Sequence, residues 1–176
     1  MSFNRKCGEC NLCCKLVPVS ELHKQANTKC TYQRYKKGCA VYPRRPQSCK
    51  LWSCQWLKNP DTIEMRRPDL SHYVIDEYLD YITVEFNSER RNIPVLQIWL
   101  DEKYPTAYKD PALLSFLNKQ GEKGILSLIR SGSDSAFVMY PPSCSPDEQW
   151  HEKRDCQKVN QHTPQEIEKA LRKNYT

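Results

Sequence analysis

The 176-residue sequence has few glycines and no long hydrophobic run. None of its five glycines forms a G-x-G-x-x-G or P-loop pattern after an expected strand, so neither standard mode of nucleotide binding is expected. No apolar run approaches the roughly 20 residues of a membrane-spanning helix, and we expect no membrane partner. The first residues also lack the apolar stretch of a secretory signal, which favours a cytoplasmic protein.

Acidic residues are nearly missing from the first third of the chain. Residues 1–58 contain twelve Lys and Arg but only Glu9 and Glu21, a net charge of +10, whereas the remainder carries −4. A basic segment of this kind is typical of nucleic-acid-binding proteins. Four thiolates around a divalent ion or an oxidised 4Fe-4S cluster carry −2, however, and two such sites would lower the segment to about +6. Much of the basic excess would then be counter-charge, and nucleic acid is not a partner that we expect.

Cysteines are concentrated in the same segment, with eight of the ten between residues 7 and 54. In a reducing compartment, clustered thiols hold metal or do redox work more often than they form disulfides. The first three are separated by two residues each, a gap that lets the chain turn back so that the sulfurs point to one centre. The eight candidate metal ligands are Cys7, Cys10, Cys13, Cys14, Cys30, Cys39, Cys49 and Cys54.

Eight thiols divide naturally into two sites of four. Cys13 and Cys14 are adjacent, so we expect their side chains to diverge and to serve different sites. Zinc modules usually present two Cys-x2-Cys pairs, and the second pair is missing here. The bacterial ferredoxin pattern expects a nearby fourth cysteine followed by proline, which is also missing. Zinc and iron therefore both stay open, with a 4Fe-4S cluster as one form of iron.

The remaining cysteines and the histidines give weaker signals. Cys144, His151, Cys156 and His162 have conceivable ligand spacing, but the first gap does not match a zinc finger, so we interpret Cys144 and Cys156 as free thiols. Two further histidines, His23 and His72, are not needed to complete two four-thiolate sites.

Three side chains of the cysteine segment have alternative interpretations. Arg45 either lies near a sulfur, where it would offset negative charge, or is solvated. The aromatic residues Trp52 and Trp56 have helical spacing, which favours packing between this segment and the rest of the chain over shielding of a metal.

Regular alternation of apolar and polar residues begins beyond residue 60. Asp76, Glu77 and Asp80 indicate a solvated charged turn before a strand rather than an acid–base pair. The expected elements are strands at 81–86, 95–100, 124–129 and 136–140, a helix that begins at Asp110-Pro111 and ends near Gly121, and a terminal helix opened by a capping box at Thr163.

These elements predict an α+β protein, in which a loop-rich cysteine module packs on a small, mainly antiparallel sheet with one or two covering helices. We place the cysteine module at residues 1–65, the sheet domain at 66–142 and a polar tail with a C-terminal helix at 143–176. Proline and charged residues near 58–70 mark the first boundary.

The cysteine segment resembles a known family. The stretch Cys7-Gly-Glu-Cys10-Asn-Leu-Cys13-Cys14, then Cys30, Gly38-Cys39, Arg45-Pro46-Gln-Ser-Cys49 and Cys54-Gln-Trp56, is similar to the signature of the CxxCxxCC zinc- or iron-chelating family, the YkgJ-type cysteine-cluster proteins. The likeness spans about residues 7–80 and includes Arg67-Pro68-Asp69. It implies metal chelation by the eight cysteines, while the role of the family is largely undefined.

Three hypotheses of function follow. The first is a metal-binding protein that chelates zinc or iron through the eight cysteines, because closed four-thiolate sites leave no position for a catalytic water. The second is an iron-sulfur redox or protein-modification enzyme, since a similar motif appears in flagellin lysine methylases. The third is a zinc module that binds nucleic acid. No catalytic residue, cofactor-binding residue or protein partner is predicted.

Overall fold

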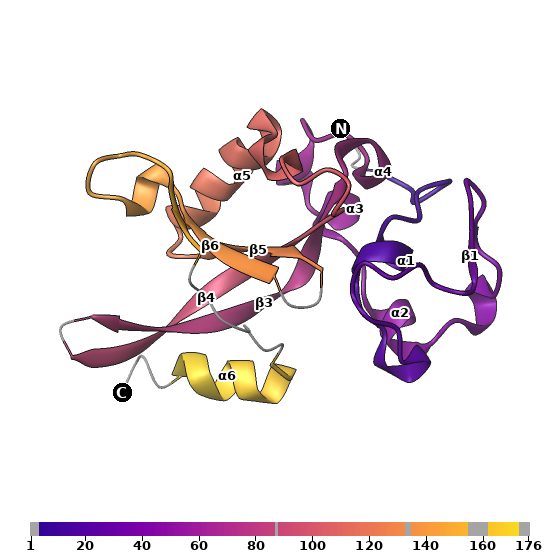
Figure 1. The fold of residues 1–176 in the computed structure, drawn as a ribbon, viewed down its shortest axis with the longest axis horizontal. Coiled ribbons are helices and arrows are strands. Elements are labelled where there is room, and N and C mark those ends of the chain that lie inside the picture. Colours follow the sequence, from indigo (N-terminus) through magenta and orange to yellow (C-terminus); the bar gives the residue numbers. More distant parts are fainter. Residues whose placement is uncertain (1–3, 87, 133–134, 155–161, 173–176) are drawn as a thin grey trace.

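The structure is a computed structural model of the chain, and it describes residues 4–86, 88–132, 135–154 and 162–172. It is an α+β fold, as predicted: a five-stranded sheet with helices on both faces lies beside a loop-rich N-terminal segment (Figure 1). Within the described residues, no helix is both long and apolar enough to cross a membrane.

The N-terminal segment contains only short elements. We call residues 4–65 the cysteine module. Its helices and strands, together with the short 3-10 turns marked η, are α1 (Cys13–Leu16), η1 (Ser20–Leu22), β1 (Gln33–Arg34), β2 (Gly38–Cys39), η2 (Tyr42–Arg44), α2 (Gln47–Leu51), α3 (Gln55–Lys58) and η3 (Pro60–Thr62).

The rest of the chain forms the sheet and its helices. Its elements are α4 (Pro68–Ser71), β3 (Tyr73–Phe86), β4 (Glu89–Leu100), η4 (Ala107–Lys109), α5 (Pro111–Gly121), β5 (Leu126–Ser131), β6 (Ser135–Tyr140), η5 (Pro142–Cys144), β7 (His151–Lys153) and α6 (Pro164–Arg172). The strand and helix predictions for this part are confirmed, although β3 and β4 begin well before the predicted strands and β7 was not predicted.

The sheet has the order β3-β4-β5-β6-β7, and every neighbouring pair is antiparallel except β4 and β5. Parallel neighbours need a crossover connection, and α5 provides it here. Asp110 starts this helix, because its side chain accepts a hydrogen bond of 3.0 Å from the Ala112 N–H. Leu113, Phe116 and Leu117 then bury one stripe of α5 against the sheet.

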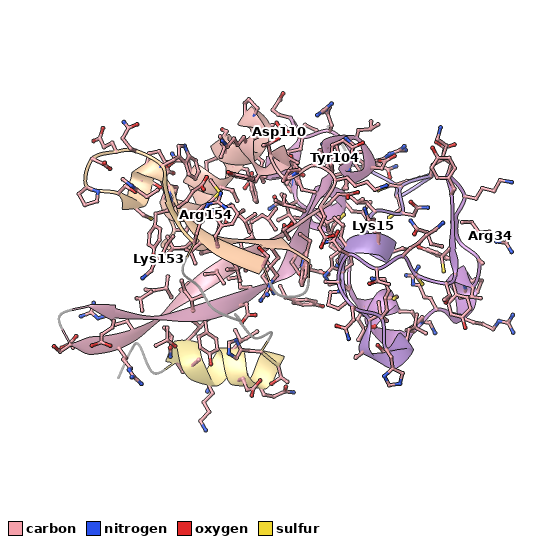
Figure 2. All side chains as sticks on the ribbon, in the orientation of Figure 1. Lys15, Arg34, Tyr104, Asp110, Lys153 and Arg154 are labelled. Atoms are coloured by element: carbon pink, nitrogen blue, oxygen red, sulfur yellow. The ribbon has the colours of Figure 1, made fainter. Side chains whose placement is uncertain are left out.

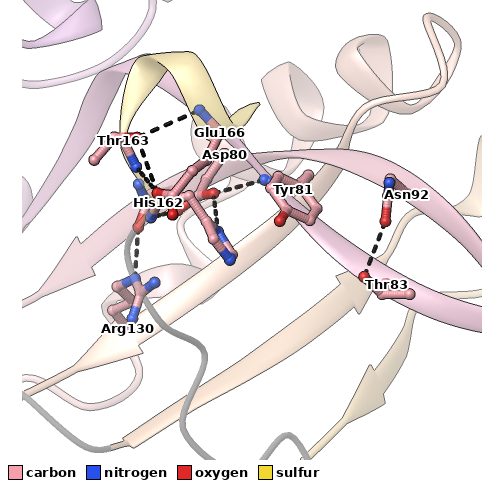
Figure 3. A network of polar contacts seen from close by, with 9 residues as sticks. Asp80, Tyr81, Thr83, Asn92, Arg130, His162, Thr163 and Glu166 are labelled. Atoms are coloured by element: carbon pink, nitrogen blue, oxygen red, sulfur yellow. Dashed lines mark hydrogen bonds and ion pairs between the residues drawn. The ribbon is translucent and has the colours of Figure 1, made fainter. Parts of the chain in front are cut away.

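The opposite face of the sheet carries α6 (Figure 1). The predicted capping box is present: Thr163 N–H donates to Glu166 Oε2 at 2.7 Å, and the Glu166 N–H donates to Thr163 Oγ1 at 3.3 Å. Just before it, the ring of His162 stacks on Tyr81, and His162 Nδ1 lies 2.8 Å from Asp80 Oδ1 (Figure 3). These contacts fix the start of α6 to β3.

The interpretation of Asp76, Glu77 and Asp80 as a solvated turn is wrong. All three lie within β3, and Asp76 and Asp80 are buried, with 6% and 1% of their surface exposed. The reason is a β-bulge between Ile75 and Leu79, which re-aims the side chains of this stretch.

The bulge joins the sheet to the cysteine module. Asp76 accepts hydrogen bonds from two indole N–H groups, from Trp52 of the module at 2.8 Å and from Trp99 of β4 at 3.1 Å. Burial raises the pKa of Asp76, and the indole donors partly offset that rise. Glu77 in turn accepts from Ser53 N–H at 2.9 Å and pairs with Lys58.

Apolar contacts complete this junction. Trp52 and Trp56 pack against a cluster that contains Leu16, Val74 and Trp99, so the prediction that these tryptophans pack between module and sheet is confirmed. Residues of the module and of the sheet thus share one buried cluster. The domain boundary that we placed at residue 65 stays a prediction.

Asp76→Ala should destabilise the protein. It leaves two indole N–H groups without their acceptor, and unsatisfied buried donors cost about 1–3 kcal/mol each, so we expect the free energy of unfolding to fall by roughly 2 kcal/mol or more. Urea unfolding followed by tryptophan fluorescence measures this. Glu85→Ala, on the exposed side of the same strand, is the control. Equal stability of the two variants would contradict the role given to Asp76.

Candidate metal centre

The first four cysteines are placed by one turn and one short helix. The Cys10 N–H donates to the Cys7 carbonyl at 2.8 Å, which closes a tight turn between them. Gly8 within this turn has a φ of 53°, a backbone conformation that glycine adopts without steric cost. The turn leads into α1, whose first two residues are Cys13 and Cys14. The Cys-x2-Cys spacing therefore brings the chain back on itself, as predicted.

The other four cysteines approach from separate loops. The Cys30 N–H donates to the Cys14 carbonyl at 3.0 Å, which ties its loop to α1. Cys39 lies in β2, and Cys49 lies within α2. Cys54 is the N-cap residue of α3 and is buried. All eight are free thiols, and Figure 2 shows sulfur atoms in several places within the module.

Cys7, Cys10, Cys13 and Cys54 form the first group of thiols, defined by the charges that act between them. Burial raises the pKa of Cys10 and of Cys54 to about 11. The charge of Cys7 adds to both shifts, and that of Cys10 adds to the shift of Cys54. The pKa of Cys13 also rises, first through a hydrogen bond with Cys14 and through burial, and then through the charges of Cys14, Cys54 and Cys10. These four side chains are close enough to repel one another as thiolates.

Cys14, Cys30 and Cys49 form a second group. Burial raises the pKa of Cys49, and the charges of Cys14 and Cys30 raise it further. All three thiols act on the buried ammonium of Lys24. The charges do not separate the two groups, because Cys14 also raises the pKa of Cys7 and of Cys13, and Cys13 also acts on Lys24. The division of the eight cysteines into two sites of four stays a prediction, and Cys39 is not assigned to either group.

The two groups are in contact. The Cys13 thiol donates a hydrogen bond to Cys14, which lowers the pKa of Cys14 to about 7 and raises that of Cys13 well above its usual value. Our expectation that these neighbouring side chains diverge is not met. The two groups thus form one continuous cluster of thiols. The first group contains more thiols, and the second lies beside the buried ammonium of Lys24.

Two cations neutralise part of this cluster. Lys24, which the sequence analysis did not single out, has 8% of its surface exposed and donates to the carbonyls of Lys15, Val17 and Gln25 at 3.0, 2.6 and 3.1 Å. No local pattern marks it, because its partners are backbone atoms of a loop. Burial raises the pKa of Cys7, and the charge of Arg45 partly offsets that rise. Arg45 also contributes to the lowered pKa of Cys14, so it acts on both groups.

Arg45 also has an unused donor. Its guanidinium stacks over the Tyr42 ring at 4.0 Å, and in the described part of the chain its buried Nε has no hydrogen-bond partner. A buried N–H without an acceptor costs free energy. A thiolate sulfur is an acceptor that such a donor could use.

The side chains as they are placed do not form a coordination sphere. Among the described residues, no group of three or more His, Cys, Asp and Glu is arranged so that it could hold a metal ion. The thiols are therefore near one another, but they do not converge on a single point.

The weaker ligand candidates have other partners. His151 Nε2 lies 2.8 Å from Asp147 Oδ1, His162 contacts Asp80, and Cys144 Sγ lies 3.2 Å from the Gly121 carbonyl. Cys156, the fourth member of that set, lies outside the described residues. His72 stacks on Tyr104 with ring centroids 3.5 Å apart, and His23 is exposed.

Glu21 fixes the helix that carries Cys49. Its carboxylate accepts from Ser48 N–H at 2.9 Å and from Ser48 Oγ at 2.7 Å, and the backbone donor contributes most to lowering its pKa to about 2. Because the folded-state pKa is lower than that of a free glutamate, this stabilisation is complete above about pH 4.5 and is lost as the pH falls through about 2.

Glu21→Gln should therefore lower the thermal midpoint at pH 7, and its difference from the wild type should shrink as the pH falls below about 4.5. Melting curves by circular dichroism over this pH range measure the effect, with the exposed Glu85→Gln as control. A difference that stays constant down to about pH 3 would contradict this role of the charge.

Comparisons with known proteins do not extend this picture. No protein-family model matches the sequence, and no curated protein or solved structure matches it at a significant level. The resemblance to the CxxCxxCC family therefore stays a prediction from the cysteine spacing.

Proposed function

We propose that the cysteine module binds zinc or iron through its thiols, with a 4Fe-4S cluster as one form that iron would take. The observation that carries this proposal is the presence of eight free thiols in a single loop-rich module, seven of which interact through their charges. Thiolates are the preferred ligands of both metals.

The small apolar core of the module supports the proposal. Within residues 4–65, the buried apolar and cysteine side chains are Leu12, Leu16, Val19, Ala26, Cys54 and Met65. A segment of about 60 residues with so few buried side chains usually needs disulfides or a metal to hold its fold. Because its cysteines are free thiols, metal–thiolate bonds are the remaining form of cross-link.

The electrostatics of the thiols fit a cation as well. Deprotonating several neighbouring thiols is unfavourable where burial and mutual repulsion raise their pKa values, and a bound cation would offset both effects. Cys14, with a pKa of about 7, would be the easiest ligand to deprotonate. The Nε of Arg45 would gain a sulfur acceptor.

The sulfurs as placed do not converge on one point, so metal coordination would require the cysteine side chains to rotate. The turn at Cys7–Cys10 and the start of α1 fix the backbone, whereas each cysteine has staggered χ1 rotamers that move its sulfur without moving the chain. We infer that the ligands reach one centre by changing rotamers, and that this happens in a reducing compartment such as the cytoplasm, where the thiols stay free.

Cys10→Ser should remove the metal from one site and destabilise the module. Cys10 belongs to the first group of thiols, and a serine hydroxyl does not replace a thiolate ligand. The measurement is the metal content per chain by elemental analysis, together with the melting curve.

The control is Cys144→Ser, which removes an exposed thiol outside the module. We expect it to leave metal content and melting unchanged. If Cys10→Ser also kept the wild-type metal ratio and melting curve, Cys10 would not be a ligand.

A further inference from the structure

The end of the cysteine module farthest from the sheet carries exposed tyrosines among basic residues. Tyr32, Tyr35 and Tyr42 have 39%, 78% and 58% of their surface exposed. The cations beside them are also exposed. We call this set the hairpin surface: Tyr32, Tyr35, Tyr42, Arg34, Lys36, Lys37 and Arg44.

One compact stretch of chain presents all of these side chains. Strands β1 and β2 pair through Gln33 and Cys39, and the Ala40 N–H extends the hairpin by donating to the Tyr32 carbonyl at 2.8 Å. The Lys37 N–H donates to the Arg34 carbonyl at 3.1 Å, which closes the turn that carries Tyr35. In Figures 1 and 2, β1 and Arg34 lie at the outer edge of the molecule, away from the sheet.

The charge of this surface has one sign only. Residues 22–60 contain nine Lys and Arg and no Asp or Glu. In the part of the chain that the structure describes, the exposed cations of the hairpin surface form no salt bridge. Their charge is therefore available to an anionic partner.

These cations are not the ones that neutralise the thiols. The cations beside the thiols are Lys24, which is buried, and Arg5, Arg45 and Arg67, which are partly buried, whereas every cation of the hairpin surface is exposed. In the sequence analysis, nucleic acid was not an expected partner because much of the positive charge was taken to balance the thiolates. The structure separates the two sets, so a metal would leave the hairpin surface basic.

We propose that the hairpin surface binds single-stranded nucleic acid, with bases stacking on Tyr32 and Tyr35 and phosphates contacting the lysines and arginines. Tyr42 offers less ring surface, because the Arg45 guanidinium already lies over its ring. Aromatic rings among cations are the usual means of binding a single strand, because every base offers a face for stacking. A duplex fits less well, since a major groove admits an α-helix or a two-stranded ribbon, and both are short here. Helices α1, α2 and α3 of the module have four or five residues, and strands β1 and β2 have two each.

The hairpin surface is tied to the thiol cluster. Asn11, which lies between Cys10 and Cys13, donates from Nδ2 to the Arg34 carbonyl at 2.8 Å and accepts at its own carbonyl from Gln33 Nε2 at 3.1 Å. The hairpin therefore depends on the fold of the cysteine module, but its binding chemistry goes beyond the proposed metal binding and does not require it.

The test is fluorescence anisotropy with labelled, mixed-sequence single-stranded DNA and RNA of roughly 12 nucleotides, using the full chain as purified. We expect binding at about 50 mM salt whose affinity falls as salt rises, by about 0.7 log units per tenfold salt for each phosphate contacted. Tyr35→Ala should weaken binding roughly 5- to 150-fold, which corresponds to the loss of one stacked base.

Matched controls separate this surface from the rest of the protein. Tyr78→Ala removes a tyrosine that is comparably exposed on β3 and should leave binding unchanged. Arg34→Ala should weaken DNA and RNA alike and reduce the salt slope, as expected of a phosphate contact. Metal content and melting of each variant show whether the module is intact. A failure of the metal proposal can therefore be told apart from a failure of nucleic-acid binding.

Three outcomes would overturn the proposal. The first is no binding of either oligonucleotide at low salt. The second is an affinity that Tyr35→Ala does not change relative to Tyr78→Ala, which would leave only non-specific charge. The third is tighter binding of an acidic peptide or of anionic vesicles than of the oligonucleotides, which would identify a different partner.

Discussion

Free thiols gather in a module that buries few apolar side chains, and their burial and mutual repulsion are the constraint on which the rest of the account depends. Burial and mutual repulsion raise the pKa values of Cys10 and Cys54 to about 11, so the cluster resists ionisation. Arg45 and Lys24 offset part of the negative charge that thiolates would bring. A metal cation would supply the rest and would add cross-links to loops that Asn11, Glu21 and Lys24 already join through hydrogen bonds.

The sheet gives this module a rigid platform. The bulge in β3 directs Asp76 toward Trp52 and Trp99, so that one buried carboxylate holds an indole from each part of the protein. Leu16 from α1 and Val74 from β3 bury the apolar side of the same junction. The cysteine module is thereby held beside the sheet, with the β1–β2 hairpin at the outer edge of the molecule (Figure 1).

Local patterns predict the regular elements well, and the tertiary contacts poorly. Asp110-Pro111 marks the start of α5, and Thr163 with Glu166 marks that of α6, because capping involves residues within one turn. The burial of Asp76 could not be predicted, since its donors come from positions 52 and 99 in the sequence. The same holds for Lys24, whose partners are loop carbonyls. The spacing of the cysteines predicts their proximity, but not the contact between Cys13 and Cys14.

The most direct test of the central claim is the metal content of the wild-type chain after anaerobic purification, measured by elemental analysis with the visible absorption spectrum. The account predicts zinc in a colourless protein, or iron with sulfide in a brown one, at one or more sites per chain. A folded protein that carries neither metal, and that takes up neither zinc nor iron when they are added under reducing conditions, would contradict it.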